Sequence, residues 1–214
     1  MMMTTDEIMR MAPVIPVMMI DDPAEAVPLS KALVDGGLKV LEITLRTPAA
    51  MEAIEVILGE VEGAVVGAGT VLEPRQLEQV GKIGCAFAVS PGFTSTLLDA
   101  ASALPCPLLP GAASASEVMQ LLERGYDRQK FFPAEAVGGA AFLKSIASPL
   151  PEAKFCPTGG IGAANAGTYL DLPNVLCVGG SWIVPQKAIK NRNWEHIKQL
   201  SIDACQLCRL EQTA

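Results

Sequence analysis

Histidine is almost absent from the 214-residue sequence, in which His196 is the single example. The sequence therefore argues against a catalytic triad that uses histidine and against a histidine-rich metal site. Cys205 and Cys208 form one CxxC pair, but no second pair or histidine cluster accompanies it, so we expect no metal site. The other cysteines lie in short apolar runs, where buried thiols are expected: Cys85, Cys106, Cys156 and Cys177.

Charge is also scarce, and basic runs and long apolar runs are missing. Charged residues make up 18% of the chain, its net charge is −7, and no basic face is visible. This composition argues against nucleic acid or an anionic membrane as a partner, although local groups could still bind an anionic small molecule. No apolar run reaches the length of a membrane span, and the acidic N-terminal stretch does not resemble a signal peptide. We therefore expect a cytoplasmic protein.

Half of the residues are hydrophobic, which supports a sizeable core, and no internal linker or low-complexity segment interrupts the chain. Residues 1–214 are therefore expected to form one domain. Short apolar runs alternate with amphipathic stretches, a pattern that predicts an α/β fold with a parallel sheet and helical crossovers. The expected strands cover residues 14–20, 39–45, 64–69, 85–90, 106–111, 129–133, 153–159 and 175–180.

Eight strands are the number that closes a (β/α)₈ TIM barrel, and a leading helix would be an N-terminal capping helix. A doubly wound open sheet is the alternative, although the first expected strand is not followed by the GxGxxG of nucleotide sites. Capping boxes and Pro/Gly pairs mark several helix boundaries. These markers are Thr4 with Glu7, Ser114 with Glu117, Pro23 with Gly36, and Pro74 with Gly81.

Polar side chains occupy one face of the second expected strand. Alternation places Glu42, Thr44 and Arg46 on one face and the apolar Leu41 and Ile43 on the other. The apolar face suits packing against helices, so the polar face would point inward, toward the strand ends where barrel enzymes gather function. The alternative is that Glu42 and Arg46 form a buried ion pair with a purely structural role.

Lys130 lies on the sixth expected strand and is followed directly by apolar residues. It shares one face of the strand with Phe132, while Phe131 lies on the other face. It would therefore point into the same cavity as Glu42 and Arg46. Desolvation and a neighbouring arginine both favour the neutral amine. A neutral lysine in a pocket forms a Schiff base with a carbonyl compound, and a carboxylate such as Glu42 can move the protons without a metal.

Pairs of glycines follow the last two expected strands, at Gly159-Gly160 and Gly179-Gly180. Barrels commonly bind phosphate at this place through backbone N–H groups, and the Ser181 hydroxyl would add a further donor. Tight turns are the alternative explanation for these glycines. Together, a lysine, a glutamate, an arginine and a phosphate cradle suit the aldol cleavage of a phosphorylated keto acid.

The segments "LEITLRT", "GAGTVL", "SPG", "KFFPAE", "FCPTGGI" and "CVGGSW" follow one another along nearly the whole length. With these motifs in this order, the chain resembles the class I aldolases of the Entner–Doudoroff pathway. These enzymes cleave 2-keto-3-deoxy-6-phosphogluconate (KDPG) and often 4-hydroxy-2-oxoglutarate (KHG). The motifs are specific together, although none is specific alone. The resemblance implies a (β/α)₈ barrel, a homotrimer and no cofactor. The implied products are pyruvate with glyceraldehyde 3-phosphate or with glyoxylate.

The resemblance also implies roles for individual residues. Lys130 would form the imine, Glu42 would transfer protons, and Arg46 and Thr70 would hold the pyruvate portion. The aldehyde and phosphate end would be lined by Thr158, Gly159, Gly160, Gly179, Gly180 and Ser181, and the pocket wall by Pro91 and Phe132.

One segment departs from the family pattern. Residues 111–115 are rich in alanine where a loop bearing serine and threonine is expected, so Ser114 would serve only as a helix cap. The related phosphogalactonate aldolases share the barrel and the lysine, but "KFFPAE" and "GGSW" are closer to the gluconate type. A catalytically silent scaffold is an alternative of another class. Intact Lys130 and Glu42 argue against it.

Overall fold

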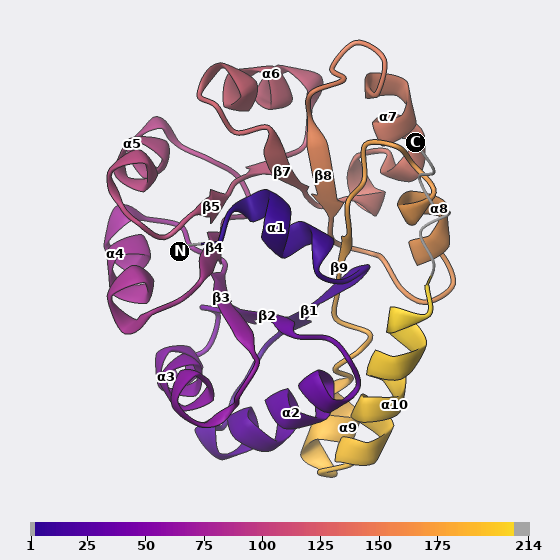
Figure 1. The fold of residues 1–214 in the computed structure, drawn as a ribbon. Coiled ribbons are helices and arrows are strands. Elements are labelled where there is room, and N and C mark those ends of the chain that lie inside the picture. The colour runs from indigo at the N-terminus through magenta and orange to yellow at the C-terminus, as the bar shows by residue number, and fades with distance from the viewer. Residues whose placement is uncertain (1–2, 208–214) are drawn as a thin grey trace.

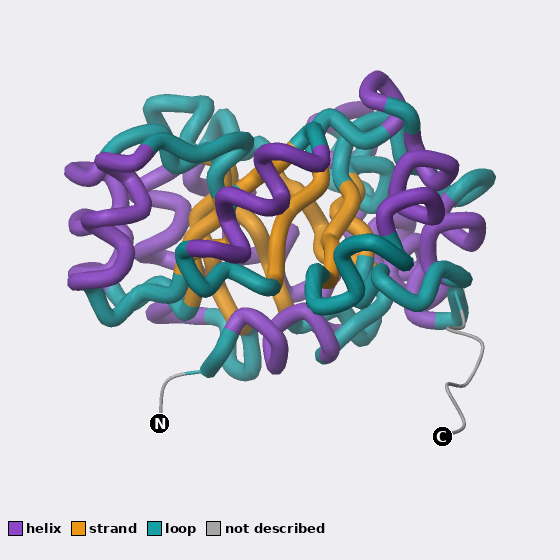
Figure 2. The backbone as a smooth tube through the Cα atoms, turned by 90° about the horizontal axis from the view of Figure 1, so that it is seen from above, coloured by secondary structure: helices purple, strands orange, loops and turns teal. Residues whose placement is uncertain are grey.

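The computed structural model of the protein describes residues 3–207. Figures 1 and 2 show the strands gathered in the middle of the molecule with most helices outside them. The strands are β1 (Val14–Met18), β2 (Val40–Thr44), β3 (Val65–Gly69), β4 (Phe87–Val89), β5 (Leu108–Leu109), β6 (Gly111–Ala112), β7 (Arg128–Phe131), β8 (Lys154–Pro157) and β9 (Val178–Gly180). The helices are α1 (Thr5–Arg10), α2 (Pro23–Asp35), α3 (Ala50–Glu60), α4 (Pro74–Ile83), α5 (Ser95–Ala103), α6 (Ala115–Glu123), the 3₁₀ helix η1 (Glu135–Val137), α7 (Gly139–Ile146), α8 (Ala166–Leu170), α9 (Gln186–Lys190) and α10 (Trp194–Cys205).

The strands form two parallel sheets. The larger sheet has six strands in the order β5-β4-β3-β2-β1-β9, and the smaller has three strands in the order β6-β7-β8. Helices connect each strand to the next, as parallel pairing requires, except that Pro110 alone separates β5 from β6. Their apolar faces pack against the outer faces of the sheets. The parallel strands and helical crossovers were therefore predicted correctly.

The prediction of one closed eight-stranded barrel is wrong, because the ladder is interrupted in two places among the described residues. Pro110, which has no N–H group, separates β5 from β6, so that β5 pairs with β4 while β6 pairs with β7. On the other side, isolated bridges rather than a continuous ladder join β8 to β9, at Phe155↔Val175 and Thr158↔Gly179. The result is a six-stranded sheet that faces a three-stranded one.

Helix boundaries follow the local sequence with one exception. Thr4 and Glu7 form the predicted capping box of α1, and α2 runs from Pro23 to a cap at Gly36. At α4, Gly81 lies inside the helix near its end, and the capping glycine is Gly84, whose φ of 100° ends the helix after Ile83. At α6 the box is incomplete. Ser114 accepts the Glu117 N–H, but the Glu117 carboxylate accepts the N–H of Ala113 instead of that of Ser114.

Helix α1 covers the ends at which the strands begin. Its buried residues Ile8 and Met9 pack in one cluster with Ile15, Val40 and Phe87 from the inner side of the larger sheet. Figure 1 shows α1 lying across the centre of the ring of strands. The helix therefore closes one end of the molecule, and the carboxyl ends of the strands lie at the other.

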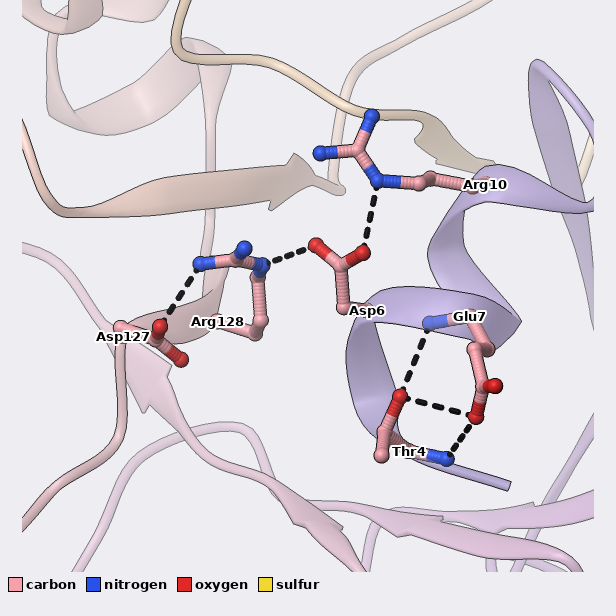
Figure 3. A network of polar contacts seen from close by, with 6 residues as sticks. All are labelled: Thr4, Asp6, Glu7, Arg10, Asp127 and Arg128. Carbon is pink, nitrogen blue, oxygen red and sulfur yellow. Dashed lines mark hydrogen bonds and ion pairs between the residues drawn. The ribbon is translucent and has the colours of Figure 1, made fainter.

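Polar contacts fasten α1 to the smaller sheet (Figure 3). The Asp6 carboxylate accepts hydrogen bonds from Arg10 Nε at 2.7 Å and from Arg128 Nε at 2.5 Å. Arg128 is the first residue of β7, and its guanidinium also contacts Asp127 at 2.9 Å. An ion-pair network thus joins the leading helix to the strand that carries Lys130.

Four of the cysteines are buried thiols. Burial raises the pKa of Cys85 to about 12 and the pKa of Cys106 to about 11, so both thiols stay protonated at neutral pH. Within the described part of the chain, no group of three or more His, Cys, Asp or Glu residues could hold a metal ion. Cys208, the second residue of the CxxC pair, lies outside that part. The cysteines predicted to be buried are so in the structure: Cys85, Cys106, Cys156 and Cys177.

No helix in residues 3–207 combines the length and the apolar character that a membrane crossing requires.

Candidate active site

Lys130 and Glu42 face each other across the interior of the molecule. Lys130 lies on β7 of the smaller sheet and Glu42 on β2 of the larger one. The Lys130 Nζ atom donates a hydrogen bond to Glu42 Oε1 at 3.3 Å. The two residues are only 6% and 3% exposed. Desolvation makes unpaired buried charges costly, so this contact satisfies both groups where water has little access.

Strand alternation places Lys130 inward, as predicted. Phe131, on the opposite face, is fully buried among the outer helices and stacks on Phe142 of α7 with ring centroids 5.1 Å apart. Phe132 returns to the inner face, where its ring centroid lies 5.3 Å from Lys130 Nζ. The apolar packing of Phe131 thus fixes the direction of the lysine next to it.

A cavity of about 330 Å³ opens at the carboxyl ends of the strands and contains the lysine and the glutamate. It brings together every predicted site residue except Gly180, which is buried and leaves room for the Trp182 ring instead. Val17 and Ile161 also line the cavity, and these apolar residues carried no signal in the sequence. The lining is Val17, Glu42, Thr44, Arg46, Thr70, Pro91, Lys130, Phe132, Thr158, Gly159, Gly160, Ile161, Gly179 and Ser181.

Arg46 lies at the exposed rim of the cavity rather than in a buried pair with Glu42. The salt bridge of Glu42 is made with Lys130. A second hollow of about 350 Å³ adjoins the cavity and shares Arg46 and Ser181 with it. The guanidinium of Arg46 is therefore placed where it can meet an anionic group from solution.

Two threonines at the cavity have unusual settings. Thr70 adopts a φ of 61°, which is rare for a β-branched residue and costs about 1–3 kcal/mol. The hydroxyl of Thr158 is buried and has no hydrogen-bond partner among the described residues. Such settings concentrate at functional sites, where a ligand can satisfy the group or use the imposed geometry. Thr44 differs, because its hydroxyl donates to the Met18 carbonyl at 2.8 Å and ties β2 to β1.

The glycines around the cavity have a second role that their sequence pattern did not reveal. A Cβ atom on Gly69 would lie 2.2 Å from Glu42 Oε1, and one on Gly179 would lie 2.2 Å from the Thr158 hydroxyl. Gly159 and Gly160 adopt φ values of 102° and 78°, which favour glycine. At Gly69 and Gly179 the missing side chain therefore gives room to Glu42 and Thr158, and at Gly159 and Gly160 it permits the left-handed backbone.

This arrangement defines a class of site. A lysine amine next to a carboxylate, buried at the carboxyl ends of parallel strands, can add to a carbonyl carbon while the carboxylate accepts and returns protons. Cationic and N–H donors at the rim can hold the anionic ends of a substrate. The site is therefore suited to Schiff-base chemistry on an anionic carbonyl compound.

Comparison with known proteins identifies the family. The sequence model of the KDPG and KHG aldolase family matches residues 5–200, and the chain belongs to this family. A 2-dehydro-3-deoxy-phosphogluconate aldolase of Zymomonas mobilis is 57% identical over 180 residues, which are 84% of this chain and 86% of the relative. The KHG/KDPG aldolase of Escherichia coli strain K12 is 47% identical over 207 residues, 97% of each chain.

Solved structures agree in fold. The KDPG aldolase of Legionella pneumophila, with pyruvate captured as a covalent carbinolamine intermediate, superposes with a TM-score of 0.92 at 49% identity, over 94% of this chain and 97% of that one. The KDPG aldolase of Z. mobilis with 3-phosphoglycerate has a TM-score of 0.90 at 51% identity, over 96% of each chain.

Proposed function

We propose that the chain is a class I aldolase that cleaves KDPG to pyruvate and glyceraldehyde 3-phosphate through a Schiff base on Lys130. The observation that carries the proposal is the buried Lys130–Glu42 pair, with 3.3 Å between Nζ and Oε1, inside the cavity. The covalent pyruvate intermediate of the L. pneumophila relative supports it. This reaction makes the chain a carbon–carbon lyase that would act in the Entner–Doudoroff pathway.

The reaction begins at the lysine. Glu42 accepts a proton from Lys130, and the neutral amine attacks the C2 carbonyl carbon of the substrate. The acid form of Glu42 returns its proton to the oxygen of the carbinolamine that forms, and this oxygen leaves as water to give a protonated imine. A carboxylate then takes the proton of the C4 hydroxyl, and the C3–C4 bond breaks. Its electron pair moves into the imine to give an enamine, while C4 leaves as the aldehyde.

The second half returns the protons. The enamine carbon C3 takes a proton from the acid form of Glu42, which restores the imine of pyruvate. Water then adds to this imine and releases pyruvate from Lys130. Because one buried carboxylate lies within hydrogen-bond reach of the amine, it can serve both proton steps in turn.

The two ends of the substrate would meet different parts of the cavity. We assign the pyruvate carboxylate to Arg46 and Thr70, and the phosphate to the Gly159–Gly160 loop and Ser181. All of these residues line the cavity. KHG has no phosphate, and its second carboxylate is bound directly to C4, so it would depend on the first set of contacts and far less on those assigned to the phosphate. The KHG/KDPG name of the E. coli relative supports this second activity, which would yield pyruvate and glyoxylate.

Covalent trapping tests the proposal. Sodium borohydride added in the presence of pyruvate should reduce the imine and attach one pyruvyl group to the chain, and peptide mapping should place it on Lys130. Lys130→Arg should remain folded but lose cleavage activity, because arginine stays protonated and cannot add to the carbonyl. Lys144→Arg, at an exposed position on α7, is the matched control and should keep full activity.

Two outcomes would contradict the mechanism: a label on another lysine, and an unlabelled chain that still cleaves KDPG. A chain that neither takes the label nor cleaves either substrate would instead match the silent scaffold.

We also propose that the enzyme is a homotrimer in the cytoplasm, as the family likeness implies. Leu72 and Met119 support association between copies, because they are large apolar residues with exposed fractions of 57% and 51%. Light scattering coupled to gel filtration should give three times the chain mass. A monomeric mass at micromolar concentration would contradict this part of the proposal.

A further inference from the structure

The KFFPAE motif contains a second charged residue, which the proposed chemistry does not use. Glu135, its last residue, is exposed at the start of η1, beyond the strand that carries Lys130. Its carboxylate accepts a hydrogen bond from the hydroxyl of Tyr169 on α8, a contact between segments 34 residues apart. Tyr169 is fully buried and is among the largest buried side chains of the core.

The Tyr169 hydroxyl is held in a donor role. Burial in the first place, and then the neighbouring Glu135 carboxylate, raise the pKa of Tyr169 well above its ordinary value, so the hydroxyl stays protonated. The hydroxyl also lies close to the start of α7, where a Cβ atom added to Gly139 would be 3.1 Å from it. The tyrosine thus connects α7 and α8 to the segment that follows β7.

Glu135 in turn fixes the glycine loop of the cavity at two points. Its backbone N–H donates to the Gly159 carbonyl at 3.1 Å. Its side-chain stem lies directly over Gly160, where an added Cβ atom would come within 2.6 Å of Glu135 Cγ. One residue earlier, the Ala134 N–H donates to the Thr158 carbonyl at 2.8 Å. Residues 134–135 therefore form the support on which residues 158–160 rest.

We infer that Tyr169 is a positioning residue that, through Glu135, holds the Gly159–Gly160 loop in the shape that receives the substrate phosphate. The inference rests on the proposed function, because it assigns the phosphate to this loop. Both glycines have positive φ values and no side chain that packs, so the loop depends on outside contacts for its shape. A loosened loop would present its N–H groups at varied positions and bind the anion less well.

The same contact has little influence on the pyruvate end. Lys130 is held by strand pairing, since Lys130 lies opposite Cys156 in the β7–β8 ladder and its N–H donates to the Pro110 carbonyl at 2.9 Å. Arg46 lies on the loop that follows β2 in the other sheet. Loss of the Glu135–Tyr169 contact should therefore separate the two substrates, which a general loss of stability would not do.

Steady-state kinetics on KDPG and KHG test the inference. Tyr169→Phe keeps the buried ring and removes only the hydroxyl. It should raise the KM for KDPG by about three- to tenfold, the scale of one lost hydrogen bond, while the KM for KHG changes less than twofold. Glu135→Ala, at an exposed position, should produce the same selective rise without touching the core. This variant decides the question if Tyr169→Phe fails to fold.

Two further variants complete the design. Glu135→Gln keeps an oxygen that can accept the hydrogen bond from the Tyr169 hydroxyl. Its KM for KDPG should therefore stay near that of the wild type. Tyr126→Phe is the matched control, because Tyr126 is the other tyrosine of the chain and its hydroxyl contacts the Leu98 carbonyl at 3.5 Å, away from the cavity. It should leave both substrates unaffected.

The inference is overturned if Tyr169→Phe and Glu135→Ala leave KDPG kinetics unchanged, or if both substrates lose equally. It is also overturned if Glu135→Gln fails to restore binding or lowers the KM for KDPG, since charge at the rim would then be the decisive property. Failure of the proposed function gives a different result, because the wild-type chain itself would neither cleave KDPG nor form the Lys130 imine.

Discussion

The place of the Glu42 carboxylate depends on a residue that has no side chain. Gly69 ends β3, directly beside β2, and its bare Cα leaves the space that the carboxylate occupies. A Cβ atom there would lie 2.2 Å from Glu42 Oε1 and 2.8 Å from Glu42 Cδ, distances that no structure tolerates without a shift. The proton-transfer group is therefore set by its neighbour as well as by its own strand.

Gly69→Ala should consequently reduce turnover without unfolding the protein. Its backbone does not need a left-handed conformation, so alanine is accepted locally, but the carboxylate must move away from Lys130 Nζ. We expect kcat for KDPG to fall by roughly 10²-fold, toward the loss of general acid–base catalysis, with a much smaller change in KM. Rapid-quench and steady-state assays measure both constants.

Gly59→Ala is the control for this change, because a Cβ atom at that helical position on α3 would meet nothing within 4 Å. It should keep wild-type turnover. Wild-type kcat in Gly69→Ala, with an unchanged melting temperature, would show that Glu42 does not need its present position.

At the scale of single residues, the sequence alone was sufficient to predict the direction of side chains that strand alternation fixes. Lys130, Glu42 and Phe132 point into the cavity because their neighbours on the other face are apolar. It was not sufficient for residues that act through a contact distant in sequence. Glu135 and Tyr169 are 34 residues apart, and no local pattern links an exposed glutamate to a tyrosine in a short helix.

At the scale of elements, helix α1 is held by charge as well as by apolar packing. Burial alone would raise the pKa of Asp6, but the hydrogen bonds from Arg10 and Arg128 outweigh it and lower the pKa below its ordinary value. Figure 3 shows both guanidinium groups directed at this carboxylate. Because the pKa is lower in the folded state, the ionised carboxylate stabilises the fold above about pH 4, and this stabilisation is lost as the pH falls through the folded-state pKa.

Asp6→Asn should therefore destabilise the protein in a pH-dependent way. At pH 7 its free energy of unfolding should be lower than that of the wild type by about 1 kcal/mol, the scale of partly exposed ion pairs. The difference should shrink as the pH falls below about 4 and disappear once the pH is below the folded-state pKa, where the wild-type carboxylate is also neutral. Urea unfolding from pH 7 to pH 3 measures it. Asp21→Asn, an exposed aspartate outside the network, is the control, and a pH-independent difference would contradict the assignment.

Local signals predicted the elements better than they predicted the way these elements pair. Caps at Thr4 and Ser114 and the proline at the start of α2 are decided by neighbouring backbone groups, so the sequence contains them. The end of α4 has two glycines close together, Gly81 and Gly84, and only the fold shows that Gly84 is the left-handed one. Such boundaries depend on packing beyond the helix itself.

At the scale of the whole molecule, the number of strands did not determine how they close. Pro110 was included within one expected strand, yet its missing N–H group divides that strand between two sheets. The site nevertheless draws on both sheets, with Glu42 from the larger and Lys130 from the smaller. The residues that would bind substrate thus lie where the two sheets face each other.

This placement predicts that pyruvate stabilises the whole molecule and not one sheet. A ligand that binds only the folded state at 100 times its Kd adds about 2.7 kcal/mol, which corresponds to a rise in Tm of about 5–10 °C for a chain of this size. Calorimetry should show one unfolding transition that moves upward with pyruvate in the wild type and in Lys144→Arg. Lys130→Arg should gain far less, because it cannot form the imine. Two transitions, of which pyruvate moves only one, would mean that the sheets unfold separately and that the ligand is held by one of them alone.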